Sequence, residues 1–133
     1  MKFLFDANMP PSWPRAISAL VVGKDARVSE VTHLRDKFDP STPDEQWLRT
    51  LADEGDWVVV SKDGFKKSDG EKHLVHRAGL AVFVLAPAWA KQKHWECTVQ
   101  IIRWWPKLVD TAALARAALR VPWNVTSKMD SIR

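Results

Sequence analysis

The chain alternates between short apolar runs and longer segments whose apolar residues recur at helical spacing. Residues 3–5, 57–60 and 80–85 form continuous apolar runs, which are typical of strands buried on both faces, and 28–34 alternates more loosely as a further strand. Helical spacing predicts helices over 11–20, 42–55, 68–77 and from Trp95 onward, with Pro106 kinking the last or starting a new one through 108–119. Strands and helices therefore alternate along the chain.

The start of the helix after Thr42 carries the clearest local signal. Thr42 is expected to cap it, Pro43 suits the first helical position, and Glu45 lies where a capping box places its carboxylate. Gly55 is expected to end the same helix.

This alternation predicts an α/β fold with three layers, α/β/α, around a mostly parallel sheet. A length of 133 residues indicates a single domain over 1–133, in which the polar segment 121–133 is an extended or loosely attached tail.

Composition narrows the class of protein. With 46% hydrophobic and 27% charged residues, the chain is ordinary for a globular protein. A single cysteine, Cys97, excludes a disulfide scaffold and a cysteine zinc cluster and fits a reducing cytosol. No apolar run approaches the ~20 residues of a membrane helix, and Asp6 interrupts any signal peptide, so we expect a cytoplasmic protein with no membrane association.

Charge is divided unevenly between the two halves of the chain. Residues 1–66 carry 9 Lys and Arg against 11 Asp and Glu, a balance of −2, and residues 67–133 carry 11 against 5, a balance of +6. The first half could hold a divalent cation and the second a polyanion, although both could equally be solvated surface.

Aspartates follow two of the predicted strands. Asp6 directly follows 3–5, and Asp63 follows 57–60. Ligands of parallel sheets bind beyond the carboxyl ends of the strands, where neighbouring strands are about 5 Å apart. Clustered carboxylates there would favour Mg²⁺ or Mn²⁺. Asp44, in the first turn of its helix, is a third candidate, while turn, cap and helix-dipole roles remain the structural alternatives for all three.

Three segments together resemble the signature blocks of PIN-like nucleases. They are Phe3-Leu4-Phe5-Asp6-Ala7-Asn8, Thr42-Pro43-Asp44-Glu45-Gln46-Trp47-Leu48 and Trp57-Val58-Val59-Val60-Ser61-Lys62-Asp63-Gly64-Phe65. The resemblance covers roughly residues 1–86 and is strongest to small proteins grouped with VapC-type toxins of toxin–antitoxin pairs.

The resemblance implies a metal-dependent ribonuclease, the toxin of a type II pair, that binds RNA and a protein antitoxin and could form a homodimer. Asp6, Asp44 and Asp63 match the catalytic, metal-binding acids, which implies Mg²⁺ or Mn²⁺ as cofactor. Asn8 lies beside this site as a candidate ligand of phosphate or water, with capping of the following helix as the structural alternative. Lys62, Lys66 and Lys67 are candidate contacts for the phosphate backbone, with plain surface lysine as the alternative.

One position departs from the family pattern. Many PIN proteins carry a further acid two residues after the third aspartate, and here that position is Phe65. A fourth ligand would have to come from Glu45, Asp69 or Glu71, or be missing. His73 and His76, three residues apart on a predicted helix, are a weaker metal pair without a third ligand.

Two other functions remain open. A phosphohydrolase or phosphoacceptor could use Asp6 as its nucleophile, although it lacks a second acid two residues later. A catalytically impaired PIN-like scaffold could instead bind protein or RNA. The tryptophans of the last third could form an antitoxin or dimer surface, or lie in the core: Trp89, Trp95, Trp104, Trp105 and Trp123.

Overall fold

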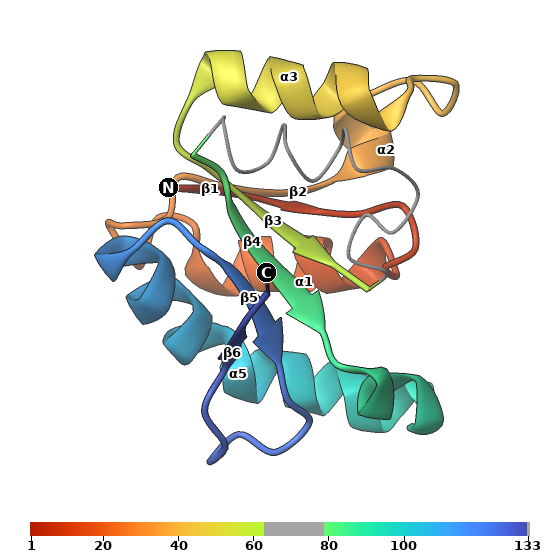
Figure 1. Ribbon diagram of the computed structural model, residues 1–133, viewed down its shortest axis with the longest axis vertical. Coiled ribbons are helices and arrows are strands. Elements are labelled where there is room, and N and C mark those ends of the chain that lie inside the picture. Colours follow the sequence, from red (N-terminus) through yellow and green to blue (C-terminus); the bar gives the residue numbers. More distant parts are fainter. Residues whose placement is uncertain (63–78, 133) are drawn as a thin grey trace.

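The computed structural model describes residues 1–62 and 79–132 (Figure 1). Within these ranges one sheet has the strand order β2-β1-β3-β4-β5-β6, in which the first five strands are parallel and β6 is antiparallel to β5. The strands are β1 (Lys2–Phe5), β2 (Glu30–His33), β3 (Trp57–Ser61), β4 (Ala81–Leu85), β5 (Ala118–Val121) and β6 (Asp130–Ser131). The helices are α1 (Ser12–Val21), α2 (Leu34–Lys37), α3 (Asp44–Glu54), the 3₁₀ helix η1 (Pro87–Lys91) and α5 (His94–Leu114).

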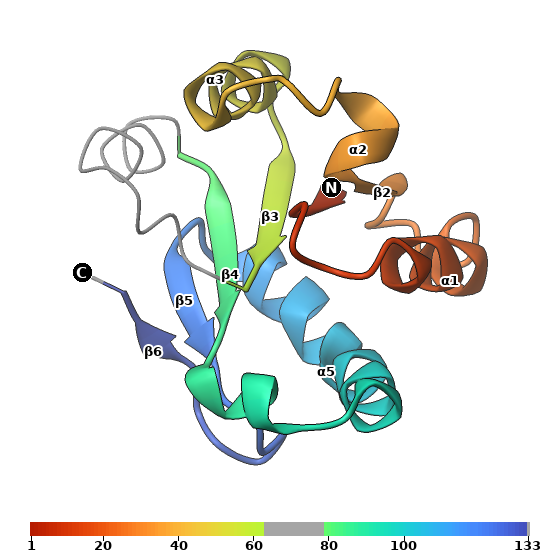
Figure 2. The same cartoon turned by 90° about the vertical axis from the view of Figure 1, so that its right-hand side faces the viewer.

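Helices cover both faces of the sheet, and strand residues alternate between them. Phe3, Phe5 and Phe83 face the cluster built with α1 and α5, whereas Leu4 and Val59 face the cluster built with α3. Figures 1 and 2 show α1 and α5 together on one side and α3 on the other. This arrangement confirms the predicted α/β fold with a mostly parallel sheet. The helices lie on both faces because strands made of continuous apolar runs must be covered on both sides.

The segment 121–132 lies against the body of the protein. Its anchor is Trp123, whose ring packs edge-on against Trp89 with centroids 4.9 Å apart. The Trp123 carbonyl accepts hydrogen bonds from Gln100 Nε2 and, at 3.4 Å, from Trp104 Nε1. The segment bends and turns between β5 and β6, and these contacts fasten it to α5.

Two helix boundaries differ from the prediction. The N-cap of α3 is Pro43, with no side-chain cap, because Thr42 lies in a turn in which its backbone N–H donates to Asp39 at 2.9 Å. The helix expected over 108–119 ends at Leu114, and Ala118–Val121 joins the sheet as β5. Pro106 lies inside α5, which continues on both sides of it.

No helix among residues 1–62 and 79–132 combines the length and apolar character needed to cross a bilayer.

Candidate functional site

The strand order reverses between β1 and β3. The chain passes from β1 to β2 on one side of the sheet and from β3 to β4 on the other, so the two neighbouring strands β1 and β3 lead in opposite directions. Such a switch point leaves a crevice outside the carboxyl ends of the two strands. Asp6 follows β1 there, and Ser61 is the last residue of β3.

The Asp6 carboxylate is held by groups from both strands. Phe5 pairs with Val60 in the parallel register, which brings the next residues, Asp6 and Ser61, side by side. Ser61 Oγ donates to Asp6 Oδ2 at 2.8 Å, and the Ala7 N–H donates to Asp6 Oδ1. Asp6 is half-buried, whereas Ser61 is fully buried. The fold therefore orients the carboxylate at the carboxyl ends of β1 and β3.

Ser61 is a site residue that the sequence did not single out. A hydroxyl at the end of an apolar strand gives no signal of its own, because its partner depends on the register of β1 and β3. The one clue is its position two residues before Asp63 in the third motif block.

The turn after Asp6 is secured by a second residue that the sequence did not predict, His33. This side chain is buried at the end of β2, and its Nε2 lies 2.8 Å from the Met9 carbonyl. Its Nδ1 accepts the Arg35 N–H at 3.1 Å, so Nε2 carries the proton and donates to Met9. His33 thereby ties the loop after β1 to the start of α2.

Asp44 begins α3 at the same end of the molecule. Since α3 leads directly into β3 and covers its face, its N-terminus lies toward the carboxyl ends of the strands (Figure 1). Asp44 is half-buried, and its Oδ1 accepts the Trp47 Nε1–H at 3.0 Å. Glu45, by contrast, is exposed and pairs with Arg49 one turn later at 3.1 Å.

The other predicted residues divide into two groups. Asn8 and Lys62 are exposed residues that follow β1 and β3, and both line one cavity at the carboxyl edge. The remaining candidates lie outside the described residues: Asp63, Lys66, Lys67, Asp69, Glu71, His73 and His76.

The oxygen atoms that the candidate residues offer are of the kind that binds hard cations. Asp6 and Asp44 offer carboxylate oxygens, the ligands that Mg²⁺ and Mn²⁺ prefer. Within 1–62 and 79–132, no group of three or more His, Cys, Asp or Glu side chains is placed to hold a metal ion. Asp63, the third candidate ligand, lies outside the described residues.

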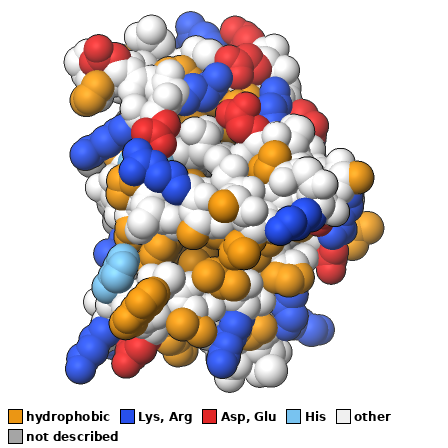
Figure 3. Space-filling model, turned by 180° about the vertical axis from the view of Figure 1, so that it is seen from behind, with side chains coloured by type: hydrophobic (Ala, Val, Ile, Leu, Met, Phe, Trp, Pro, Cys, Tyr) orange, Lys and Arg blue, Asp and Glu red, His pale blue; other side chains and the backbone are white. Residues whose placement is uncertain are grey.

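The tryptophans of the last third are mainly core. Trp89, Trp104 and Trp105 are buried and Trp123 is half-buried, whereas Trp95 is 75% exposed. Trp95, Val99 and Ile102 form an exposed stripe along α5. Figure 3 shows hydrophobic side chains gathered over the α1 and α5 side of the molecule.

Comparison with known proteins gives one match. A family model described as a PIN like domain matches residues 1–87, more than half of the 133-residue chain. No curated protein and no solved structure matches the chain at a significant level.

Proposed function

The chain belongs to the PIN-like domain family, a nuclease-like fold, and from this premise we propose that it is a divalent-metal-dependent endoribonuclease. The observation that carries the proposal is the Asp6 carboxylate, held by Ser61 at the switch point between β1 and β3. In the proposal, Asp6, Asp44 and Asp63 hold Mg²⁺ or Mn²⁺, with Glu45 as a further candidate.

The bound ion would supply Lewis acidity toward the scissile phosphate and lower the pKa of an attacking water. The chain's own residues orient the reactants. Ser61 fixes the Asp6 carboxylate, and His33 fixes the turn that carries Asn8. Lys62, joined in the proposal by Lys66 and Lys67, offers positive charge to the phosphate backbone. Hydrolysis would leave a 5′-phosphate and a 3′-hydroxyl, as the family resemblance implies.

The test is substitution of single aspartates. Asp6→Asn and Asp63→Asn should each abolish Mn²⁺-dependent RNA cleavage, because an amide replaces an anionic metal ligand. Cleavage of a fluorescent RNA by the purified variants, with circular dichroism as the check on folding, measures this. Asp53→Asn, an exposed position on α3, is the matched control and should cleave like the original chain. Retained cleavage by Asp6→Asn would exclude the assignment.

The proposed biological role is the toxin of a type II toxin–antitoxin pair in the cytoplasm. The exposed stripe of Trp95, Val99 and Ile102 supports a protein partner, an antitoxin or a second copy of the chain. Expression of the chain should arrest growth, and the Asp6→Asn variant should not.

The same stripe favours a second candidate function, a scaffold that binds protein or RNA without cleaving it. Phe65, where many relatives carry an acid, also favours it. A scaffold would show no Mn²⁺ binding that depends on Asp6, which calorimetric titration with Mn²⁺ can distinguish.

A further inference from the structure

A cavity of about 240 Å³ opens beside the candidate site at the carboxyl edge of the sheet. Its walls come from the loop after β1, the start of α1, the residue after β3, the end of β4, η1 and the start of α5. Asn8 lies two residues after Asp6, and Lys62 directly follows the Ser61 that holds the Asp6 carboxylate. The cavity therefore adjoins the candidate active site through Asn8 and Lys62.

The floor of the cavity is apolar and aromatic. Trp13 and Trp89 line it, and each indole N–H is used within the protein: Trp13 Nε1 donates to Thr98 Oγ1 at 2.9 Å and Trp89 Nε1 to the Val121 carbonyl at 3.0 Å. Cys97 adds a thiol whose pKa is raised by burial and which donates to the Trp89 carbonyl. Trp13 is 6% exposed and Trp89 is 2% exposed, so the rings show the cavity only a small part of their surface, and that part is apolar.

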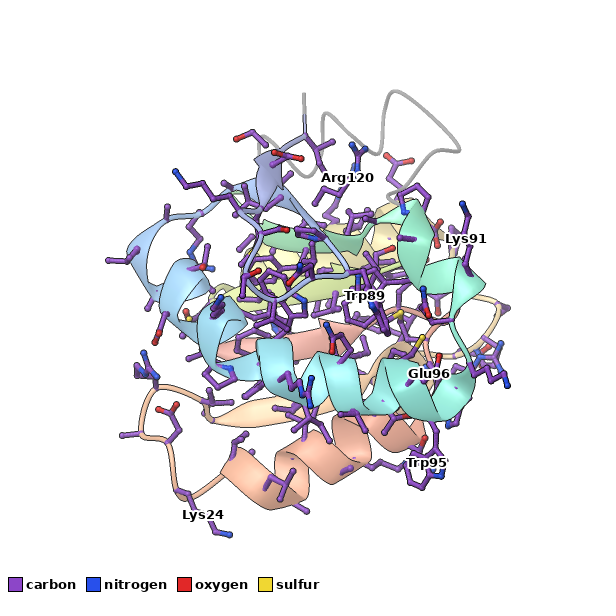
Figure 4. All side chains as sticks on the ribbon, turned by 90° about the horizontal axis from the view of Figure 1, so that it is seen from below. Lys24, Trp89, Lys91, Trp95, Glu96 and Arg120 are labelled. Atoms are coloured by element: carbon purple, nitrogen blue, oxygen red, sulfur yellow. The ribbon has the colours of Figure 1, made fainter. Side chains whose placement is uncertain are left out.

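The rim is polar and carries positive charge. Asn8 and Gln92 bring amides, His94 an imidazole and Lys62 an ammonium group, and no carboxylate lines the cavity within the described residues. The exposed His94 ring lies parallel to Trp13, with centroids 6.1 Å apart and planes at 22°, so it extends the aromatic surface toward solvent. In Figure 4 Trp89 points into the body of the molecule while Lys91, at the end of η1, points outward.

We infer that this cavity binds a single unstacked nucleobase of a single-stranded RNA, next to the phosphate cleaved at Asp6. A base needs an apolar surface for its faces and amide-type groups for its edges, and proteins that read single-stranded RNA supply such pockets. The cavity lies below the ~300 Å³ at which pockets for drug-sized ligands begin, which suits a ring system rather than a whole nucleotide. The inference rests on the proposed function, since the strand must pass Asp6.

The test uses RNA hexamers in metal-free buffer, so that it is independent of cleavage. A hexamer with bases should shift the indole N–H resonances of Trp13 and Trp89 and should bind about tenfold more tightly than an abasic hexamer, because stacking is worth about that much per base. Ala90→Trp, at an exposed position lining the cavity, should fill it and remove the advantage. Ala113→Trp, exposed near the far end of α5, is the matched control and should keep it.

Gln92→Ala and His94→Ala provide variants that leave the floor intact and should each weaken base-dependent binding severalfold. Equal affinity for the two hexamers, or a base advantage that survives Ala90→Trp, would overturn the inference. The proposed function is tested separately, by Mn²⁺-dependent RNA cleavage. Absence of cleavage would contradict the proposed function, whereas the metal-free titration tests only whether the cavity binds a base.

Discussion

At the scale of single residues, a hydrogen bond between neighbouring strands helps to orient the Asp6 carboxylate of the candidate site. Ser61 is fully buried, so its hydroxyl needs a partner, and the register of β1 and β3 supplies the Asp6 carboxylate 2.8 Å away. A bond from a neutral donor to a charged acceptor is worth about 1.5–3 kcal/mol. The bond fixes the orientation of the Asp6 carboxylate.

Removal of this hydroxyl should weaken metal binding more than it weakens the fold. We expect Ser61→Ala to lower the affinity for Mn²⁺ by about 10- to 100-fold, the usual cost of losing a group that orients a metal ligand. Calorimetric titration with Mn²⁺ measures it. Ser29→Ala, an exposed serine whose Oγ donates to the Met1 carbonyl at 3.3 Å, is the control. Unchanged Mn²⁺ affinity in Ser61→Ala would contradict the orienting role.

At the scale of elements, a charged contact joins α2 to α3 on the side away from the site. Lys37 Nζ lies 3.0 Å from Glu54 Oε1 and 5.2 Å from the centre of the Trp57 ring. The Trp57 indole donates to the same Glu54 oxygen at 3.0 Å. The hydrogen bond from Lys37 is the main cause of a Glu54 pKa below the 4.5 of an unperturbed glutamate, and the Trp57 bond adds to it.

This contact predicts a pH dependence of stability. A carboxyl whose pKa is lowered by folding stabilises the fold above its unfolded pKa, near 4.5, and this contribution is lost as pH falls through the folded value. Lys37→Met should raise the Glu54 pKa toward 4.5. Because both side chains are partly exposed, it should lower the free energy of unfolding at pH 7 by only ~0.2–1 kcal/mol.

Carboxyl NMR titration of Glu54 and urea unfolding at pH 7 and pH 3 measure these changes. The stability difference between the Lys37→Met variant and the original chain should shrink at pH 3. A Glu54 pKa that does not move would refute the assignment. Lys24→Met, an exposed lysine beyond α1, is the control.

Helices and strands could be predicted from the sequence where apolar residues follow one another closely. The prediction was wrong where tertiary contacts determine the secondary structure. Continuous apolar runs identified β1, β3 and β4, because a short run of this kind is typical of a strand buried on both faces of a parallel sheet. The alanine-rich stretch after Leu114 favours a helix by propensity. Residues 118–121 of this stretch form β5 instead, because pairing with β4 gives the backbone N–H and C=O groups at the edge of β4 hydrogen-bond partners.

The helix that carries Trp95 was predicted, but its buried face was not. Trp95, Val99 and Ile102 define an apolar stripe by spacing alone, and the structure turns them to solvent. Cys97, Ile101 and Trp104 are buried instead. With two apolar stripes on one helix, the sequence cannot say which one the sheet covers.

For the whole molecule, the carboxyl edge of the sheet concentrates the candidate chemistry. The rule that parallel strands end at one edge places Asp6 and the start of α3 there, so their location could be predicted from strand order alone. Ser61 and the aromatic cavity could not, since they depend on register and on the packing of η1 and α5 against the strand ends. Opposite this edge lies Lys24, far from Lys91 in Figure 4.

This polarity makes a prediction for RNA binding as a function of salt. Each lysine that contacts a phosphate of single-stranded RNA contributes about 0.7 to the slope of log affinity against log salt, because binding releases condensed counterions. In an Asp6→Asn background, which prevents cleavage, Lys62→Ala should therefore reduce that slope by about 0.7. Lys24→Ala removes the same charge beyond the end of α1, far from Lys91 in Figure 4, and should leave the slope unchanged. Fluorescence anisotropy of a labelled RNA between about 50 and 200 mM salt measures both variants over the range in which this effect is large. Equal slopes for the two variants would mean that RNA binds through overall charge, and the strand would then not be aligned along the carboxyl edge.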